Sequence, residues 1–304
     1  MIRASLHRWS PDGKVAKMVK LPRKRASQSH GNQSTVYVPV ILKIFRDRYR
    51  PGATSIIFSL DDVRNAVDAV RAESATPDDI SSRNPADVIY RMRSRTMLPA
   101  EILDKGFHIL RAIGRGQYQF ERATSTIIEP PVSTPISTID HTPMPVRRLL
   151  PVSLAEMDEQ AVLSVASYCL VLDHFAGMKI YRLRSHVRKS VPGVGQAELD
   201  AIDVGIAGSE DEVPVVFPIE AKAAADALNR VQIYNMVQYA IHYFPGLVVR
   251  PLALKVDHES VIHIMEFNNA ARAADLKILK SASYIIDTSD AQKAMIQATK
   301  VPRQ

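Results

Sequence analysis

The sequence predicts a mixed α/β protein (α+β) with two domains. Its 304 residues exceed the usual size of one domain, and a hydrophobic fraction of 46% is enough for ordinary packed cores. Helical and strand-like periods both occur along the chain, and a stretch rich in Pro, Ser and Thr at residues 123–152 divides it. We therefore expect a small domain over residues 35–122, a linker, and a larger domain over residues 153–304.

The charge of the chain favours an anionic partner. The formal net charge is +7, and nucleic acid is the commonest polyanion that a basic protein binds. In residues 1–34, Lys and Arg outnumber the single acid, Asp12, so we expect a flexible basic arm there. Contact with phosphates and a solvated tail without a partner are both open interpretations of this arm.

Cysteine usage and hydropathy exclude two classes of protein. The single cysteine, Cys169, rules out an intrachain disulfide, and its place in an apolar helical pattern is typical of a buried thiol. No apolar run reaches the roughly 18 residues of a transmembrane helix, and the basic N-terminus lacks the apolar core of a secretory signal. We therefore expect a cytoplasmic protein that does not enter a membrane.

Three helices followed by a hairpin are expected in the smaller domain. Ser59 and Asn84 stand where side chains cap a helix N-terminus, and Pro85 fills the favoured first position of the third helix. Gly114 and Gly116 mark the tight turn of the hairpin. The expected helices are Val36–Arg50, Ser59–Arg71 and Pro85–Arg95, and the expected strands are Phe107–Ile113 and Gln117–Arg122.

This order is that of a winged helix-turn-helix domain. The last helix of such a domain enters the major groove of DNA, and the hairpin forms the wing. Here the third helix carries Arg91, Arg93 and Arg95, and the hairpin tip carries Arg115. We expect these four residues to contact double-stranded DNA. A protein-interaction module of the same fold and a small domain with a solvated basic helix are the alternatives.

The larger domain is expected to alternate helices and strands. Ser153 can cap its first helix, and Gly177 can end it. Runs of apolar residues and turn residues then predict three strands, a helix, two strands and a last helix. The expected ranges are Leu154–Phe175, Lys179–Val191, Glu198–Ile206, Val213–Ala223, Asp226–Tyr243, Leu247–Val256, Val261–Phe267 and Ala270–Lys280.

Two of these strands carry acids where a core strand should carry none. Glu198 and Asp200 are two apart on the first, and Glu220 and Lys222 are two apart on the second, so each pair shares one face of its strand. Asp203 would point to the other face. If the strands are neighbours, three carboxylates converge, and such a group repels itself unless a cation lies among the acids.

Carboxylates that hold Mg²⁺ next to a lysine suit the cleavage of phosphodiester bonds. The metal neutralises developing negative charge and activates water, and the lysine orients that water. A half-exposed sheet edge with solvated charges is the alternative interpretation. On the strand before, His186 and Arg188 share one face. We expect them to contact the DNA backbone or to be plain surface charges, and contact with the scissile phosphate is the alternative.

The sequence around these strands resembles the PD-(D/E)xK nuclease superfamily. The acid-x-Lys signature is Glu220-Ala221-Lys222, and Asp200 matches the single Asp of the preceding strand, with Leu199 where many members have Pro. Residues 185–232 also resemble bacterial endonuclease-like proteins that combine an N-terminal winged helix with this core. The resemblance implies a restriction-endonuclease-like fold, in which a helix, three strands, a helix and a strand surround a mixed sheet.

The resemblance also implies roles for individual residues. Asp200 and Glu220 would ligate Mg²⁺, or Mn²⁺ in its place, and Glu198 would be a further metal ligand. Lys222 would position the nucleophilic water. Gln232 matches a Gln that several branches of the superfamily place near the active site.

We therefore expect a Mg²⁺-dependent endodeoxyribonuclease that acts in restriction or phage defence, a role that rests on family analogy. A homodimer is expected because double-strand cutting by a single active site usually needs two copies. The alternative is a non-enzymatic DNA-binding regulator with an inactive nuclease-like core. A nuclease that acts on RNA or on recombination intermediates is a third interpretation.

Overall fold

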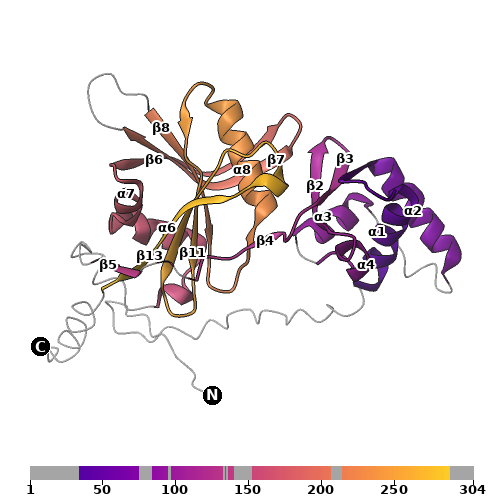
Figure 1. Ribbon diagram of the computed structural model, residues 1–304, viewed down its shortest axis with the longest axis horizontal. Coiled ribbons are helices and arrows are strands. Elements are labelled where there is room, and N and C mark those ends of the chain that lie inside the picture. The colour runs from indigo at the N-terminus through magenta and orange to yellow at the C-terminus, as the bar shows by residue number, and fades with distance from the viewer. Residues whose placement is uncertain are drawn as a thin grey trace, which may run out of the picture.

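Two bodies lie side by side in the computed structural model (Figure 1). The smaller body extends from residue 34 to residue 122, and the larger body holds most of the chain from residue 153 onward. The predicted basic arm lies outside the described residues, except for Ser34. The structure describes residues 34–74, 84–94, 97–132, 134, 136–139, 153–206 and 214–287.

In its described residues, the smaller body packs four helices against a three-stranded antiparallel sheet with the order β1-β3-β2. The three predicted helices and the predicted hairpin are present, and a strand and a short helix are added to them. The elements are α1 Ser34–Arg48, β1 Ser55–Ser59, α2 Leu60–Glu73, α3 Ala86–Ser94, α4 Ala100–Leu103, β2 Phe107–Gly114 and β3 Gln117–Arg122.

Local capping explains where these helices begin. The Ser59 side chain accepts a hydrogen bond from the backbone N–H of Asp62, and the Asp62 carboxylate accepts one from the backbone N–H of Ser59. This reciprocal capping box satisfies two N–H groups that the helix itself leaves unpaired. Asn84 likewise accepts from the backbone N–H of Ala86 at 3.1 Å, at the start of α3. Both predicted caps are confirmed.

The larger body is built on a mixed eight-stranded sheet with the order β5-β13-β12-β11-β8-β7-β6 and with β10 beside β8. β6, β7 and β8 form an antiparallel meander, and β11 runs parallel to β8. The strands are β5 Ile136–Ile139, β6 Ile180–Val191, β7 Gly195–Ile206, β8 Pro214–Lys222, β10 Val248–Val249, β11 Leu252–Val256, β12 Ile262–Phe267 and β13 Ile278–Ile286.

Helices cover both faces of this sheet, as the predicted α/β class requires. α6 (Glu159–Tyr168) and α7 (Val171–Ala176) pack on the face that holds Phe217 and Ile219. α8 (Arg230–Tyr243) packs on the opposite face and lies between the sheet and the smaller body (Figure 1). β8 is buried on both faces because alternate side chains enter the two cores.

Two predicted helices differ from the structure. The predicted helix Leu154–Phe175 is divided into a 3₁₀ turn (η2, Leu154–Glu156), α6 and α7. Extended backbone at Met157 and Asp158 separates η2 from α6, and Leu170, with a left-handed φ of 55°, separates α6 from α7. The predicted helix Ala270–Lys280 is wrong. A short 3₁₀ turn (η3, Ala273–Asp275) leads into β13 instead. Pairing with β12 and burial of Tyr284 and Ile286 outweigh the helical propensity of this segment.

The Pro-rich segment after β3 is more structured than the linker that its composition predicts. Ile127–Ile128 (β4) pairs with Leu228–Asn229 (β9), just before α8. β5 extends the large sheet at its edge by pairing with β13. Short isoleucine-containing runs between the prolines provide free N–H groups for these ladders, so proline restricts the strands to short stretches. Residues 140–152 lie outside the described part of the chain.

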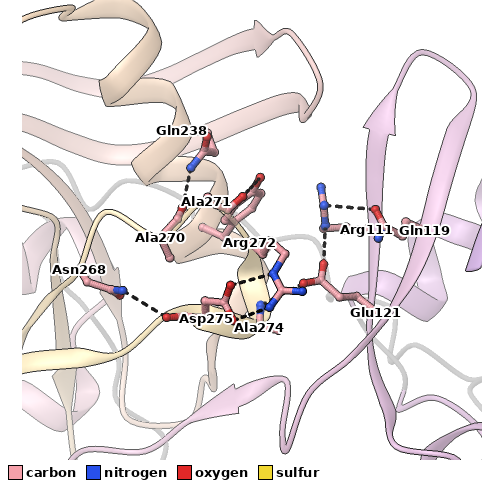
Figure 2. A network of polar contacts seen from close by, with 11 residues as sticks. Arg111, Gln119, Glu121, Gln238, Asn268, Ala270, Ala271, Arg272, Ala274 and Asp275 are labelled. Atoms are coloured by element: carbon pink, nitrogen blue, oxygen red, sulfur yellow. Dashed lines mark hydrogen bonds and ion pairs between the residues drawn. The ribbon is translucent and has the colours of Figure 1, made fainter. Parts of the chain in front are cut away.

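A buried polar network joins the two bodies (Figure 2). Arg111 on β2 forms an ion pair with Glu121 on β3 at 3.0 Å, and both side chains are buried. The Arg111 guanidinium also lies 5.0 Å from the ring centroid of Tyr234 on α8. Glu121 accepts a hydrogen bond from the backbone N–H of Ala274 at 3.2 Å, and Ile109 of β2 joins the core beneath α8. The hairpin is therefore fixed against the larger body.

Candidate functional site

Asp200 and Glu220 lie where β7 and β8 separate. The last paired residues of this ladder are Ala201 and Ile219, each next in sequence to one of the two acids. The Asp200 Oδ2 accepts a hydrogen bond from the backbone N–H of Ala221 at 2.8 Å. Glu220 shares its face of β8 with Val216, which packs in the core beneath α8, and the negative charge of Asp200 acts on Glu220 from β7. The structure thus brings these two predicted site residues together.

Glu220 is a buried acid with a strongly shifted pKa. Its side chain is 5% exposed, and burial raises its pKa to about 7. The Lys222 ammonium opposes this rise, whereas the nearby charges of Asp200 and Glu159 add to it. Near neutral pH the carboxyl group is therefore balanced between its protonated and ionised forms, a property of many functional acids.

Lys222 is a buried cation that faces this acid. Its Nζ lies 2.8 Å from the Glu220 Oε1 and 3.5 Å from the Glu159 Oε1. Burial lowers the pKa of Lys222, but the negative charges of Glu220, Asp200 and Glu159 outweigh burial and raise it. The ammonium therefore stays charged at neutral pH and supplies a fixed positive charge beside the two carboxylates.

Glu159 belongs to this group although its sequence position does not suggest a site. It opens α6, and its neighbour Asp158 caps that helix by accepting from the backbone N–H of Ala161 at 2.8 Å. Acids in a first helical turn are ordinary because they complement the helix dipole, so the pattern gave no separate signal. The only available signal is its place at the start of the helix that precedes the three strands.

Glu198 lies apart from the buried acids. Its side chain is exposed, forms an ion pair with Arg188 at 3.0 Å and accepts a hydrogen bond from Gln196 at 2.9 Å. Within the described ranges, no three side chains of His, Cys, Asp or Glu gather in a way that could hold a metal ion. Of the three predicted metal ligands, Asp200 and Glu220 form the close pair, while Glu198 lies on the wall of a neighbouring cavity.

That cavity has a volume of about 640 Å³ and is bounded by both bodies. Lys222 and Glu159 reach it from the larger body, and α3 of the smaller body forms part of its wall. Gln232, another predicted site residue, is exposed on α8 and faces the same space. The lining residues that bear on its chemistry are Tyr90, Arg93, Glu159, Arg188, Glu198, Lys222, Asp226, Gln232 and Asn235.

The arginines predicted to contact DNA from α3 do not share one face. Arg93 lines the cavity, whereas the Arg91 guanidinium lies 5.2 Å from the ring centroid of Tyr37 on α1. Residues two apart on a helix project in nearly opposite directions, which explains the division. Arg115 is exposed at the hairpin tip. Arg95 lies outside the described residues.

On β6, His186 is exposed and has a left-handed backbone with φ 50°, and Arg188 lines the cavity. The competing acid Asp203 lies opposite Phe217 in the ladder, on the face covered by α6 and α7. It is buried, pairs with Arg182, and has a pKa that burial raises. Asp203 therefore lies on the opposite face of the sheet from Glu220.

The donor set fits a magnesium ion. Mg²⁺ in nucleotide-processing sites is usually held by one or two carboxylates together with waters and substrate phosphates. Asp200 and Glu220 are such a pair. Burial is the main cause that raises the pKa of Glu220, and the charge of Asp200 adds to it, so a cation between the two acids would favour the ionised form. Comparison with protein-family models, curated proteins and solved structures finds no match for this chain. No helix in the described residues has the length and apolar character needed to cross a bilayer.

Proposed function

We propose that the protein is a Mg²⁺-dependent endodeoxyribonuclease of the PD-(D/E)xK type. The observation that carries this proposal is the buried pair of Glu220 and Lys222, with Asp200 hydrogen-bonded to the backbone N–H of Ala221 between them and the cavity beside Lys222. A buried acid and a buried lysine are costly for a sheet to keep, and buried charged groups with shifted pKa values gather at functional sites. Their chemistry is that of phosphodiester hydrolysis.

The order of elements supports the proposal. α6 and α7, the meander β6–β7–β8, α8 and then β11 follow the helix, three strands, helix and strand expected of such a core. In the smaller body, α1, α2 and α3 precede the hairpin β2–β3, which agrees with a winged helix-turn-helix domain. A role in restriction or phage defence and assembly as a homodimer extend the proposal by family analogy.

In this mechanism Asp200 and Glu220 would hold Mg²⁺, which when bound polarises the phosphate and lowers the pKa of a coordinated water. Lys222 would donate hydrogen bonds to the attacking water and offset negative charge in the transition state. Glu159 would keep the Lys222 ammonium oriented across their 3.5 Å contact. Arg188 and Arg93, on the cavity wall, would bind phosphate oxygens of the strand.

Cleavage of supercoiled plasmid in Mg²⁺ tests the proposal. Wild-type protein should nick or linearise the plasmid, and Asp200→Asn and Lys222→Arg should lose that activity by about 100-fold or more, as expected when an electrostatic group is removed. Glu259→Gln, at an exposed position of the loop after β11, is the matched control and should cut normally. Thermal unfolding of each variant separates lost chemistry from lost folding. Normal cutting by both site variants would refute the assignment.

A non-enzymatic DNA-binding regulator is the second candidate. One observation favours it: Lys222 already contacts two carboxylates, and Glu198 is engaged by Arg188. Ion pairs of this kind are expected in a site that has lost its catalytic activity and whose charged side chains are paired with one another. The regulator predicts salt-sensitive DNA binding and no cleavage in Mg²⁺ or Mn²⁺. Any metal-dependent cutting that Asp200→Asn abolishes excludes it.

A further inference from the structure

An oxygen without a partner lies in the wall of the cavity between the two bodies. Oδ1 of Asn235 is buried and accepts no hydrogen bond from any described residue. Asn235 follows Gln232 by three residues on α8, so both amide side chains lie on the side of the helix that faces the cavity. Buried polar groups are normally satisfied, and an exception inside a cavity points to a ligand that brings a donor.

The opposite wall of the cavity carries an aromatic ring and a cation that are also three residues apart on a helix. Tyr90 and Arg93 are three apart on α3, and both line the cavity. Tyr90 is 48% exposed, whereas its neighbours Val88 and Ile89 are buried in the core of the smaller body. An exposed ring beside an arginine is the usual platform for a nucleic-acid base and its phosphate.

These groups suit a base that has left its stack. An aromatic side chain reaches the face of a base only when that base is unpaired and unstacked, because a duplex exposes base edges alone in its grooves. Side-chain amides such as those of Asn235 and Gln232 then pair with the Watson–Crick edge of that base. A cavity of about 640 Å³ is of the size of a small-molecule site.

We propose that this cavity binds an unpaired nucleotide of the DNA substrate. Its base lies against Tyr90 and is hydrogen-bonded by Asn235, and its phosphate lies between Arg93 and Lys222. The inference rests on the proposed nuclease function and specifies its substrate class as DNA with an unpaired strand. The smaller body then acts as one wall of the active-site cavity, through α3.

Fluorescence anisotropy with the full chain tests binding separately from cleavage. The probes are a fluorescein-labelled single-stranded DNA 12-mer, the same 12-mer with a central abasic site, its RNA counterpart, and a fully paired hairpin of equal length. Ca²⁺ replaces Mg²⁺ to hold back cleavage. The single strand should bind at least about tenfold more tightly than the hairpin, and the abasic strand should lose about that factor, as base stacking predicts.

Variants identify the groups that bind. Tyr90→Ala should weaken single-strand binding about tenfold, Tyr90→Phe should restore it, and Tyr168→Ala, at an exposed tyrosine on α6, should change nothing. Asn235→Leu should weaken binding of the base-containing strand but not of the abasic strand. Its melting temperature should stay the same or rise, since the unpaired oxygen is gone. A purely structural role of Asn235 predicts lower stability instead.

The failures of the two proposals are distinguishable. Equal affinity for strand and hairpin, tighter binding of the RNA, or no loss with the abasic strand and with Tyr90→Ala would overturn the inference, whatever the protein cuts. Single-strand binding of the expected pattern, together with no cleavage in Mg²⁺ or Mn²⁺, would overturn the nuclease and leave the binding site in place. Equal cutting rates on fully paired and on gapped DNA would overturn the unpaired-nucleotide site and leave the nuclease function in place.

Discussion

The Nζ of Lys222 lies 2.8 Å from the Oε1 of Glu220, and both side chains are buried between the large sheet and the cavity. Burial removes most of the water that would stabilise the charge of either group, so the charged form of each one is stabilised mainly by the other. Asp200 and Glu159 add negative charge from β7 and α6, which leaves the group with more carboxylates than cations. This imbalance determines how the site should respond to pH, to metal and to mutation.

The first prediction concerns pH. The pKa of Glu220 rises from 4.5 to about 7 on folding, so between these values the folded state binds a proton that the unfolded state lacks. Stability should therefore fall as the pH rises from about 5 to 8 without metal, by roughly 3 kcal/mol. Glu220→Gln should flatten this dependence. Urea unfolding at several pH values measures it, and an equal slope in wild type and variant would contradict the assignment.

The second prediction concerns metal. Mg²⁺ must displace the proton from Glu220, so its binding should strengthen as the pH rises through about 7. Excess Mg²⁺ should raise the melting temperature of wild type more at pH 8 than at pH 6, with stabilisation of about 2.7 kcal/mol at a hundred times the dissociation constant. Asp200→Asn and Glu220→Gln should show no response, while Glu259→Gln should respond as wild type does. Equal responses in all four proteins would place the ion elsewhere.

The third prediction concerns the lysine. Lys222→Met leaves Glu220 buried without its cation, which should cost about 3–5 kcal/mol at pH 8. At pH 5 the cost should shrink, because Glu220 is then protonated in the folded state. The double variant Lys222→Met, Glu220→Leu should recover most of the loss at pH 8. Urea unfolding of the double-mutant cycle gives these values, and a pH-independent loss would argue against direct coupling of the two groups.

Local patterns in the sequence suffice to predict the strands of this site, but not which side chains helix packing brings to it. β8 falls within one residue of its predicted ends, because an apolar run between turn residues determines it. Strand alternation distinguishes Asp200 from Asp203 in the sequence, and in the structure Asp203 lies opposite Phe217 on the face of α6 and α7. Glu159 and Tyr90 reach the site only through packing of α6 and α3, which no short pattern encodes. The prediction of a helix at Ala270–Lys280 was wrong for the same reason, because the end of that segment pairs with β12 as part of β13.

The interface between the bodies gives the fourth prediction. Arg111→Ala leaves Glu121 buried with the N–H of Ala274 as its one remaining donor among the described residues, so stability should fall by about 3–5 kcal/mol. Tyr234 loses its cation partner as well. Arg64→Ala breaks an exposed ion pair and should cost less than about 1 kcal/mol. Urea unfolding compares the two, and a small loss in Arg111→Ala would mean that the bodies are joined by their apolar contacts alone.

The fifth prediction follows from the charges on the cavity wall. Arg93, Arg188 and Lys222 are balanced there by three acids, which are Glu159, Glu198 and Asp226. A neutral wall attracts a polyanion weakly, so single-stranded DNA should bind poorly in EDTA and much better in Ca²⁺. Glu198→Gln should strengthen binding in EDTA, because it frees Arg188 from their 3.0 Å ion pair.

Anisotropy titrations in EDTA and in Ca²⁺ measure both effects on one probe. Glu156→Gln, at an exposed acid that does not line the cavity, is the matched charge control and should leave binding in EDTA unchanged. The gain from Glu198→Gln should shrink as salt is added, since it comes from phosphate contacts that counterions compete with. Equal gains from both variants would mean that net charge alone, rather than the freed Arg188, governs binding to this wall.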